Sequence, residues 1–390
     1  MKPPLRFRAL LWTVTLVAAV PCHAFKLLPT AKEPDAESRR LGLGTITGIV
    51  ESPLMKVYLD QFSTPVHEDL THRAYGCDSG HERCKDKGAP RAVIEGVQWN
   101  DNPPFSYRRL RLTVSPTCMG VTIQLPNLHP TCWTTIFASA AGTATAARGR
   151  AFGPNDTLLE RSHFGDLQFI HAMAIDGEAP QVTRGNILAW ARFAYLVSVG
   201  DIASGAVMSD GNAVGSIASF FPAQGDSVLT LFTKGTEPHS DERARDMAFG
   251  SLLHLVQDSF SKSHVEREGV RKSDGALLPG RVLQFHSYAH QDPYVHAQRD
   301  ALEALEKNAE ESSLLTAIGV RLVALRARKA PFDDVQRVLD SLFELSEKAV
   351  AAGPGKEFEV KPAEKDPSPG AQGTPSSPAG HISFMEVPHA

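Results

Sequence analysis

The 390-residue chain has almost no excess charge and few aromatic residues. Lysine and arginine number 40 against 44 aspartates and glutamates, so no general basic field exists to hold nucleic acid by charge alone. Aromatic residues make up only 7% of the chain, while the 42% hydrophobic and 22% charged fractions are ordinary for a folded protein. This composition excludes wholesale disorder and a multi-span membrane protein. Histidine is abundant at 15 residues, a first indication of metal chemistry.

Common catalytic signatures are also missing. The sequence contains no Gly-x-Ser-x-Gly motif, no Walker phosphate loop and no paired Cys/His signature. Their absence disfavours the main rival classes of enzyme.

Apolar runs long enough to span a bilayer are scarce. Residues 1–24 have a basic start and a short apolar stretch, so we interpret them as a secretory signal peptide cleaved near Ala24. Cys22 leaves a lipoprotein anchor as the alternative, which the preceding proline disfavours. The apolar segment 186–208 is interrupted by Arg192 and Asp201, which favours a buried helix over a membrane span. We therefore expect a secreted or periplasmic protein with no transmembrane span in the mature chain.

Only four cysteines follow the signal peptide: Cys77, Cys84, Cys118 and Cys132. An even number of cysteines in an exported chain favours disulfides. Of the three pairings, we favour Cys77–Cys84 and Cys118–Cys132, because each closes a short loop. A four-cysteine zinc site is the alternative, but the sequence lacks any Cys-x-x-Cys spacing.

The hydrophobic pattern predicts one mainly α-helical domain over residues 25–352. Helices are expected near residues 65–76, 186–208, 240–267, 294–326 and 331–352. Residues 77–160 are predicted to form a loop-rich insertion that contains the disulfides, with short extended pieces such as 110–114 and 121–125. Residues 353–390 are rich in proline, glycine and serine, which predicts a disordered tail.

The segment HLVQDSFSKSH, from His254 to His264, is the most informative one. His254 and Asp258 are four residues apart, so on a helix they share a face. His264 lies ten residues beyond His254 and would point to the flank of that face. One pair with an offset third ligand suits two adjacent metal ions better than one, and zinc accepts this mixture of nitrogen and oxygen ligands.

A second pair with the same spacing is formed by His296 and Asp300. His286 and His290 are an alternative at that spacing. We favour His296 and Asp300, because two dications need carboxylates to neutralise them.

Three further candidate ligands lie upstream. His67 shares a helical face with apolar residues and points inward, whereas His72 is predicted to point to solvent. Asp101 lies on a loop made rigid by two prolines. His163 is followed within one turn by an aspartate that can accept its ring N–H. His171 is its competitor, and we interpret it as a satisfied core histidine on an apolar face.

The His254–His264 segment resembles the metal-binding helix of zinc-dependent bacterial phospholipase C and the related fungal single-strand nucleases. That family uses His-x3-Asp-x5-His, which His254, Asp258 and His264 match position for position. Four other segments resemble the family's remaining ligand segments in the same order: VHEDLTHRA with His67, QWNDNPP with Asp101, SHFGD with His163, and HAQRD with His296 and Asp300. The resemblance covers scattered segments between about 64 and 305.

The resemblance implies a mainly α-helical fold with a three-zinc cluster. One zinc would take Asp101, His163, His254 and Asp258, a second would take His264, His296 and Asp300, and a third would take His67 and Asp258. In the family the third zinc also binds an N-terminal tryptophan a few residues before the first histidine. Cleavage near Ala24 would leave His67 more than forty residues inside the chain. We therefore expect two or three zinc ions.

These inferences predict an exported zinc-dependent phosphodiester hydrolase of the phospholipase C type. It would use a metal-activated water oriented by Asp101 as the catalytic residue. Phospholipid head groups are the expected substrate and single-stranded nucleic acid is the alternative, with no stable protein partner predicted. The alternative from another class is a non-catalytic exported metal-binding protein that retains the fold.

Overall fold

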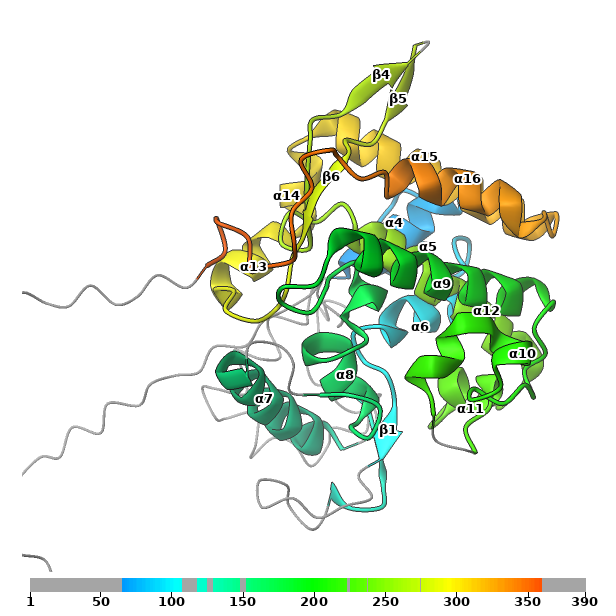
Figure 1. Ribbon diagram of the computed structural model, residues 1–390. Coiled ribbons are helices and arrows are strands. Elements are labelled where there is room, and N and C mark those ends of the chain that lie inside the picture. Colours follow the sequence, from blue (N-terminus) through cyan, green and yellow to red (C-terminus); the bar gives the residue numbers. More distant parts are fainter. Residues whose placement is uncertain are drawn as a thin grey trace, which may run out of the picture. The chain divides into compact units, whose positions relative to one another are not determined.

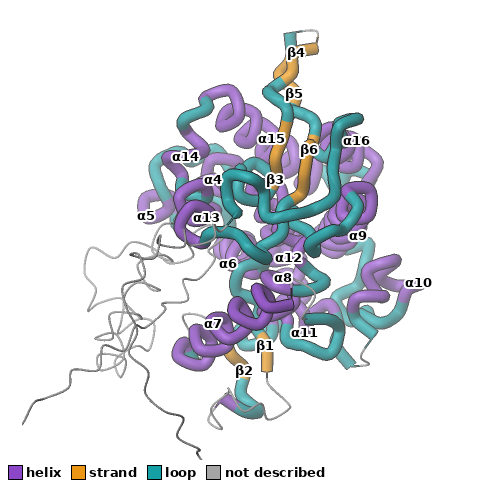
Figure 2. Tube along the Cα trace, turned by 60° about the vertical axis from the view of Figure 1, so that its left-hand side comes forward, coloured by secondary structure: helices purple, strands orange, loops and turns teal. Residues whose placement is uncertain are grey.

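The computed structural model describes residues 65–106, 118–124, 129–147, 152–222, 225–236, 238–273 and 275–359. The predicted signal peptide, the extended piece at 110–114 and the tail beyond residue 359 lie outside the described residues. The described part is mainly helical, as expected (Figures 1 and 2). Among its helices, we find none that combines the length and the apolarity needed to cross a membrane.

The helices follow one another along the chain as α4 (Val66–Ala74), α5 (His81–Cys84), α6 (Arg91–Trp99), α7 (Pro130–Ala147), α8 (Leu158–Phe164), η2 (Gln168–His171), α9 (Pro180–Val199), α10 (Gly211–Val214), η3 (Gly215–Phe220), α11 (Val228–Thr233), α12 (Asp241–Asp258), α13 (Pro293–Arg299), α14 (Leu302–Glu306), α15 (Ala309–Ala327) and α16 (Phe332–Leu342). Three antiparallel two-stranded ribbons accompany them: β1 (Phe105–Ser106) with β2 (Thr122–Ile123), β3 (Val265–Arg267) with β6 (Val282–Phe285), and β4 (Arg271–Ser273) with β5 (Ala276–Leu278).

Helices α6 and α12 cross at two glycines. A Cβ on Gly96 of α6 would lie 2.2 Å from the Met247 carbonyl oxygen, and one on Gly250 of α12 would lie 2.2 Å from the Val93 carbonyl oxygen. The two backbones can approach this closely only because neither residue carries a side chain. This contact therefore fixes the distance between α12 and the residues that follow α6.

The main hydrophobic core surrounds α9 and α12. Trp99 at the end of α6 stacks on Trp190 of α9, with ring centroids 5.7 Å apart, and its Nε1 donates to the Leu231 carbonyl at 3.0 Å. A second, smaller core joins α7 and α8 through residues such as Trp133 and Phe164. The buried side chains at the end of α6 hold the loop that follows it.

Helix α12 begins at a serine cap and ends earlier than predicted. The Ser240 hydroxyl accepts from the Arg243 amide, and two acidic residues in the first turn suit the positive end of the helix dipole. The helix stops at Asp258, although the pattern predicted helix to about 267. Ser259, Ser261 and Ser263 follow, and their hydroxyls compete for backbone groups, which favours a turn. His264 therefore comes from a turn and not from the helix.

Other element boundaries also differ from the sequence prediction. The helix expected at 294–326 is divided into α13, α14 and α15, and the one expected at 331–352 ends at Leu342. The region 77–160 contains the helices α6 and α7 as well as loops. The buried helix expected at 186–208 exists as α9, which ends at Val199 with Gly200 at φ +91°.

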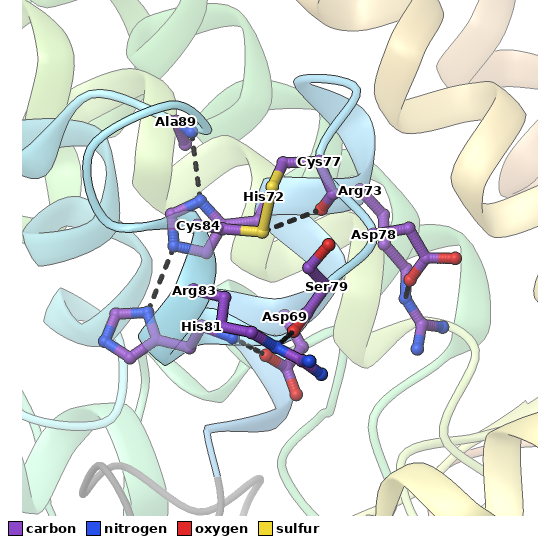
Figure 3. The surroundings of a disulfide bond; sticks show 10 residues. All are labelled: Asp69, His72, Arg73, Cys77, Asp78, Ser79, His81, Arg83, Cys84 and Ala89. Carbon is purple, nitrogen blue, oxygen red and sulfur yellow. Dashed lines mark hydrogen bonds and ion pairs between the residues drawn. A yellow bond between two sulfur atoms is a disulfide. The ribbon is translucent and has the colours of Figure 1, made fainter.

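Both favoured disulfides are present. Cys77 pairs with Cys84 and Cys118 pairs with Cys132, with Cα atoms 5.9 and 5.7 Å apart. Around the first disulfide, Figure 3 shows His72 directed at His81, which corrects the solvent-facing prediction for His72. His72 is 1% exposed, its Nδ1 accepts from the Ala89 amide at 3.0 Å, and its Nε2 lies 3.1 Å from Nδ1 of His81.

The packed body continues to Glu359, past the predicted boundary at residue 352. We call Gly353–Glu359 the C-terminal strap. Phe358 in the strap is 2% exposed, and the Gly353 carbonyl accepts from the Ser287 amide at 2.8 Å. The glycine and proline content of this segment predicted disorder, although the apolar side chain of Phe358 anchors it.

Candidate metal centre

Histidine and aspartate side chains from five parts of the chain meet inside the protein. Three groups have ligand atoms within 4.8 Å of one another: His67, His254 and Asp258; Asp101, His171 and His254; and His264, His296 and Asp300. Because the first two groups share a histidine, we call them together the first cluster, and we call the third group the second cluster. Every one of these side chains is at most 2% exposed.

The elements described above bring these residues together. Helix α12 supplies His254 and Asp258 from its last two turns, as the four-residue spacing predicted. Helix α4 supplies His67 near its start, and Asp101 follows the C-terminal end of α6. His171 ends the short helix η2. The glycine crossing of α6 and α12 therefore sets the separation between Asp101 and the ligands of α12.

The histidines of the first cluster each use one ring nitrogen to contact an oxygen at the edge of the cluster. His254 Nδ1 donates to the Val97 carbonyl at 2.7 Å, and His171 Nε2 donates to the Asn100 carbonyl at 3.1 Å. His67 Nδ1 donates to Gln257 Oε1 at 2.6 Å. These acceptors favour a proton on the outer nitrogen, so the inner nitrogen of each ring could bind a metal ion through its lone pair.

The inner nitrogens face Asp258. Nε2 of His254 and Nδ1 of His171 each lie 2.9 Å from Asp258 Oδ2, and Nε2 of His67 lies 3.4 Å from Oδ1. Asp258 also approaches the second cluster, where His264 Nδ1 is 3.6 Å from Oδ2. This carboxylate therefore lies near both clusters.

The second cluster is oriented in the same way. His264 Nδ1 donates to the His171 carbonyl at 2.7 Å, and His296 Nδ1 donates to Gln291 Oε1. Their Nε2 atoms lie 3.5 and 2.8 Å from Asp300 Oδ2. The Ser261 and Ser263 hydroxyls donate to Asp300 Oδ1, so the second carboxylate oxygen is the one directed at the histidines.

The surroundings of Asp101 fit a cation. Both of its carboxylate oxygens are buried and accept no hydrogen bond from the residues that the structure describes. The ring nitrogens of His171, His254 and His67 lie 3.6, 3.7 and 3.8 Å away, outside hydrogen-bond distance. A buried carboxylate without hydrogen bonds is costly, and a coordinated metal ion would remove that cost. The donor set of nitrogen and oxygen atoms therefore fits a metal ion.

The protonation of these groups follows from burial and charge. Burial, followed by the charges of Asp258 and Asp300, raises the pKa of Asp101 well above its usual value. Although burial opposes it, His254 and His264 hold the pKa of Asp258 well below its usual range. Burial lowers the pKa of His67 and His171 to about 4, so both rings are neutral at pH 7, the form in which histidine binds metals.

His264 differs from the other histidines. Burial alone would lower its pKa, but the charges of Asp258 and Asp300 raise it to about 9. A metal ion that binds Nε2 of His264 near neutral pH must therefore displace a proton.

The structure differs from the sequence prediction at one ligand. His163 belongs to none of the three groups, and His171 stands in its place beside Asp101 and His254. The His163 ring packs edge-on against Phe137, with centroids 5.1 Å apart, and its Nδ1 lies 3.2 Å from the Leu159 carbonyl. Both histidines follow apolar residues at helical spacing, so no local signal separates them. Only the fold places the core histidine His171 in a group that could hold a metal ion.

The structure also decides between the two downstream pairs. His296 and Asp300 lie in the second cluster, whereas His286 and His290 lie in none of the groups found among the described residues. His286 Nδ1 instead donates to the Ser263 carbonyl at 3.1 Å.

We compared the chain with models of protein families, with curated proteins and with solved structures, and none of the three comparisons found a match.

Proposed function

We propose that this chain is an exported zinc-dependent phosphodiester hydrolase of the phospholipase C and single-strand nuclease type. The observation that carries the proposal is the pair of buried clusters that lie on either side of Asp258. Together they offer the inner nitrogens of five histidines and the carboxylates of three aspartates. Their order along the chain agrees with the resemblance described above, with His171 in place of His163.

The ligand set supports zinc. Zinc accepts imidazole nitrogen and carboxylate oxygen together, whereas calcium and magnesium prefer oxygen alone. Three carboxylates offset most of the charge of two dications, which makes two adjacent ions tolerable in a buried site.

Bound dications would polarise a phosphodiester and lower the pKa of a nearby water. The chain's own contribution is orientation and charge. Asp101 has two oxygens without hydrogen bonds from described residues, so one can accept the proton of a water while the other faces the cluster. The neutral rings of His67 and His171 add no positive charge that would repel a cation.

Phospholipid head-group release is the first reaction to test. The two disulfides support export. The chain's net charge of −4 gives no electrostatic advantage to a polyanionic nucleic acid substrate.

The test combines metal analysis with hydrolysis of bis(p-nitrophenyl) phosphate by the purified full chain. We expect zinc-dependent hydrolysis, a loss of at least about 100-fold in kcat for Asp101→Asn, and no change for the exposed control Asp333→Asn. Parallel assays with phosphatidylcholine vesicles and single-stranded DNA separate the two substrate classes. Bound zinc without hydrolysis of any of these substrates by the wild type would replace the proposal with a non-catalytic metal-binding protein.

A further inference from the structure

The C-terminal strap is attached to the loop that precedes His296. The carbonyl of Phe358 accepts from the Asp292 amide at 2.5 Å, and Glu357 forms an ion pair with Arg299 of α13. Residues 286 and 353 form a parallel β-bridge, and residues 291 and 359 form an antiparallel one. The strap therefore contacts this loop at both of its ends and also holds the helix that carries His296.

Gln291 connects the strap to the second cluster. Its amide nitrogen donates to the Pro354 carbonyl and to the Ser263 carbonyl, both at 2.8 Å. Two carbonyl acceptors fix which end of the amide is nitrogen, so the oxygen must face His296 Nδ1. This oxygen can only accept, and the proton of His296 is therefore held on Nδ1. Nε2 is left directed at Asp300.

Ser263 is shared by the same network. Its carbonyl accepts from Gln291, and its hydroxyl donates to Asp300 Oδ1. Gln291 thus contacts His296 directly and is linked to Asp300 through Ser263.

Gly355 allows the strap to lie against this network. It has φ +79°, and a Cβ there would lie 2.6 Å from Cε1 of His286. His286 is 2% exposed and donates its backbone amide to the His264 carbonyl at 2.8 Å. A side chain at position 355 would have to push the strap away from the strand end that leads to the cluster.

We propose that Gln291 and the C-terminal strap are positioning elements for metal binding at the second cluster. This inference rests on the proposed function, since it assumes that the second cluster holds a metal ion. Gln291 orients His296, the Pro354 carbonyl orients Gln291, and Gly355 permits the approach. Within the described part of the chain, the hydrogen bonds of the strap lead to the second cluster, so we expect its effect to be confined there.

Equilibrium dialysis of the full-length protein against graded free Zn²⁺, with bound zinc counted per chain, tests the proposal. We expect Gln291→Leu and Gly355→Val to weaken one class of bound zinc by about 10- to 100-fold, the cost typical for removing an outer partner of a ligand. The exposed strap variant Lys356→Ala should bind zinc as the wild type does. Gln291→Glu keeps the acceptor for His296 but loses the two donors, so its affinity should lie between wild type and Gln291→Leu.

Combined variants separate positioning from general destabilisation. In a His296→Ala background the second cluster is already broken, so adding Gln291→Leu should change nothing further. In a His171→Ala background the full effect of Gln291→Leu should persist. If Gln291→Leu instead weakens zinc equally in both backgrounds, or lowers the thermal stability of the zinc-free protein together with both classes of site, the strap is merely structural and the inference is overturned.

The two proposals fail in different ways. A wild-type chain that binds no zinc overturns the proposed function. A wild-type chain that binds zinc with the same affinity as Gln291→Leu overturns only the positioning role.

Discussion

At two of the five histidines, a glutamine side chain determines which ring nitrogen faces the candidate metal centre. Gln257 does so for His67 as Gln291 does for His296, because each amide oxygen accepts from the outer ring nitrogen. The Gln257 amide nitrogen in turn donates to the Thr71 hydroxyl at 2.9 Å. A side chain that is neither charged nor a ligand therefore fixes the tautomer at each cluster.

Spacing patterns predicted some residues of the candidate site and missed His171. His254 with Asp258, and His296 with Asp300, could be recognised because the i, i+4 spacing converts directly into a shared helical face. His171 could not be recognised, because it reaches the cluster from a short helix whose position depends on the packing of distant segments. Its place among apolar residues predicted an ordinary core histidine, and its ring is indeed fully buried.

Alanine substitutions of the two competing histidines test this assignment. We expect His171→Ala to lose zinc from the first cluster, because it removes a ligand beside Asp101. His163→Ala should keep the wild-type number of bound zinc ions and lose about 1–3 kcal/mol of stability from the cavity beside Phe137. Metal analysis and urea denaturation of both variants provide the measurement. Zinc loss in His163→Ala with retention in His171→Ala would reverse the assignment.

A pH effect is expected at His81, away from the clusters. Burial, then the charges of His72 and Lys85, lowers its pKa from 6.5 to about 4, against the weaker opposing effect of Glu82. As the pH falls, His81 therefore binds a proton near pH 6.5 in the unfolded chain but only near pH 4 in the folded chain. The free energy of unfolding therefore keeps its full value above pH 6.5 and decreases as the pH falls from 6.5 towards 4.

Urea denaturation at pH 7.5 and pH 5, with chelator present, measures this effect. The wild type should lose about 1 kcal/mol more stability between the two pH values than His81→Gln, allowing for solvent screening of the ring. The glutamine oxygen can still accept from His72, so the contact in Figure 3 is retained while the titration is removed. Equal losses in the two proteins would contradict the prediction.

Among the helices, the crossing of α6 and α12 matters most for the site. A sequence pattern can predict an amphipathic helix, but it cannot show that two glycines on different helices meet.

Helix α7 was not predicted, for a related reason. Its sequence PTCWTTIFASAAGTATAA contains no charged residue, so no charged face marks it as an amphipathic helix. Serines after Asp258 ended α12 where the apolar pattern alone predicted continuation.

Alanine substitutions distinguish the crossing from ordinary helical glycines. Gly96→Ala would place a methyl group against the backbone of α12, so we expect a loss of about 1–3 kcal/mol and weaker zinc binding through displacement of Asp101. Gly185→Ala, in α9 with nothing within 4 Å of the added Cβ, should be neutral or up to about 1 kcal/mol stabilising. Thermal unfolding and zinc titration of the pair check this, and similar behaviour of the two variants would refute it.

For the molecule as a whole, we expect the buried carboxylates, above all Asp101, to make stability depend on metal. Asp101, Asp258 and Asp300 lie close together at no more than 2% exposure, an arrangement that is unfavourable without cations. When the free concentration of an ion is about 1,000 times its dissociation constant, binding of that ion should add about 4 kcal/mol to the free energy of unfolding.

Thermal unfolding with zinc and with excess chelator measures this dependence. We expect a clear fall in Tm on chelation in the wild type and a smaller fall in a variant that lacks ligands from both clusters, His171→Ala with His296→Ala. An unchanged Tm in the wild type, at zinc concentrations that saturate binding, would show that the clusters are stable without ions.

The attachment of residues 353–359 beside residue 291 has a consequence for biosynthesis. The two clusters draw on positions from 67 onward, but the clamp on the second one is among the last described parts of the chain to leave the ribosome. A growing chain would therefore present a nearly complete first cluster long before the second could be assembled. Ion loading would then proceed in two stages, and the later stage would wait until residues 353–359 have been made.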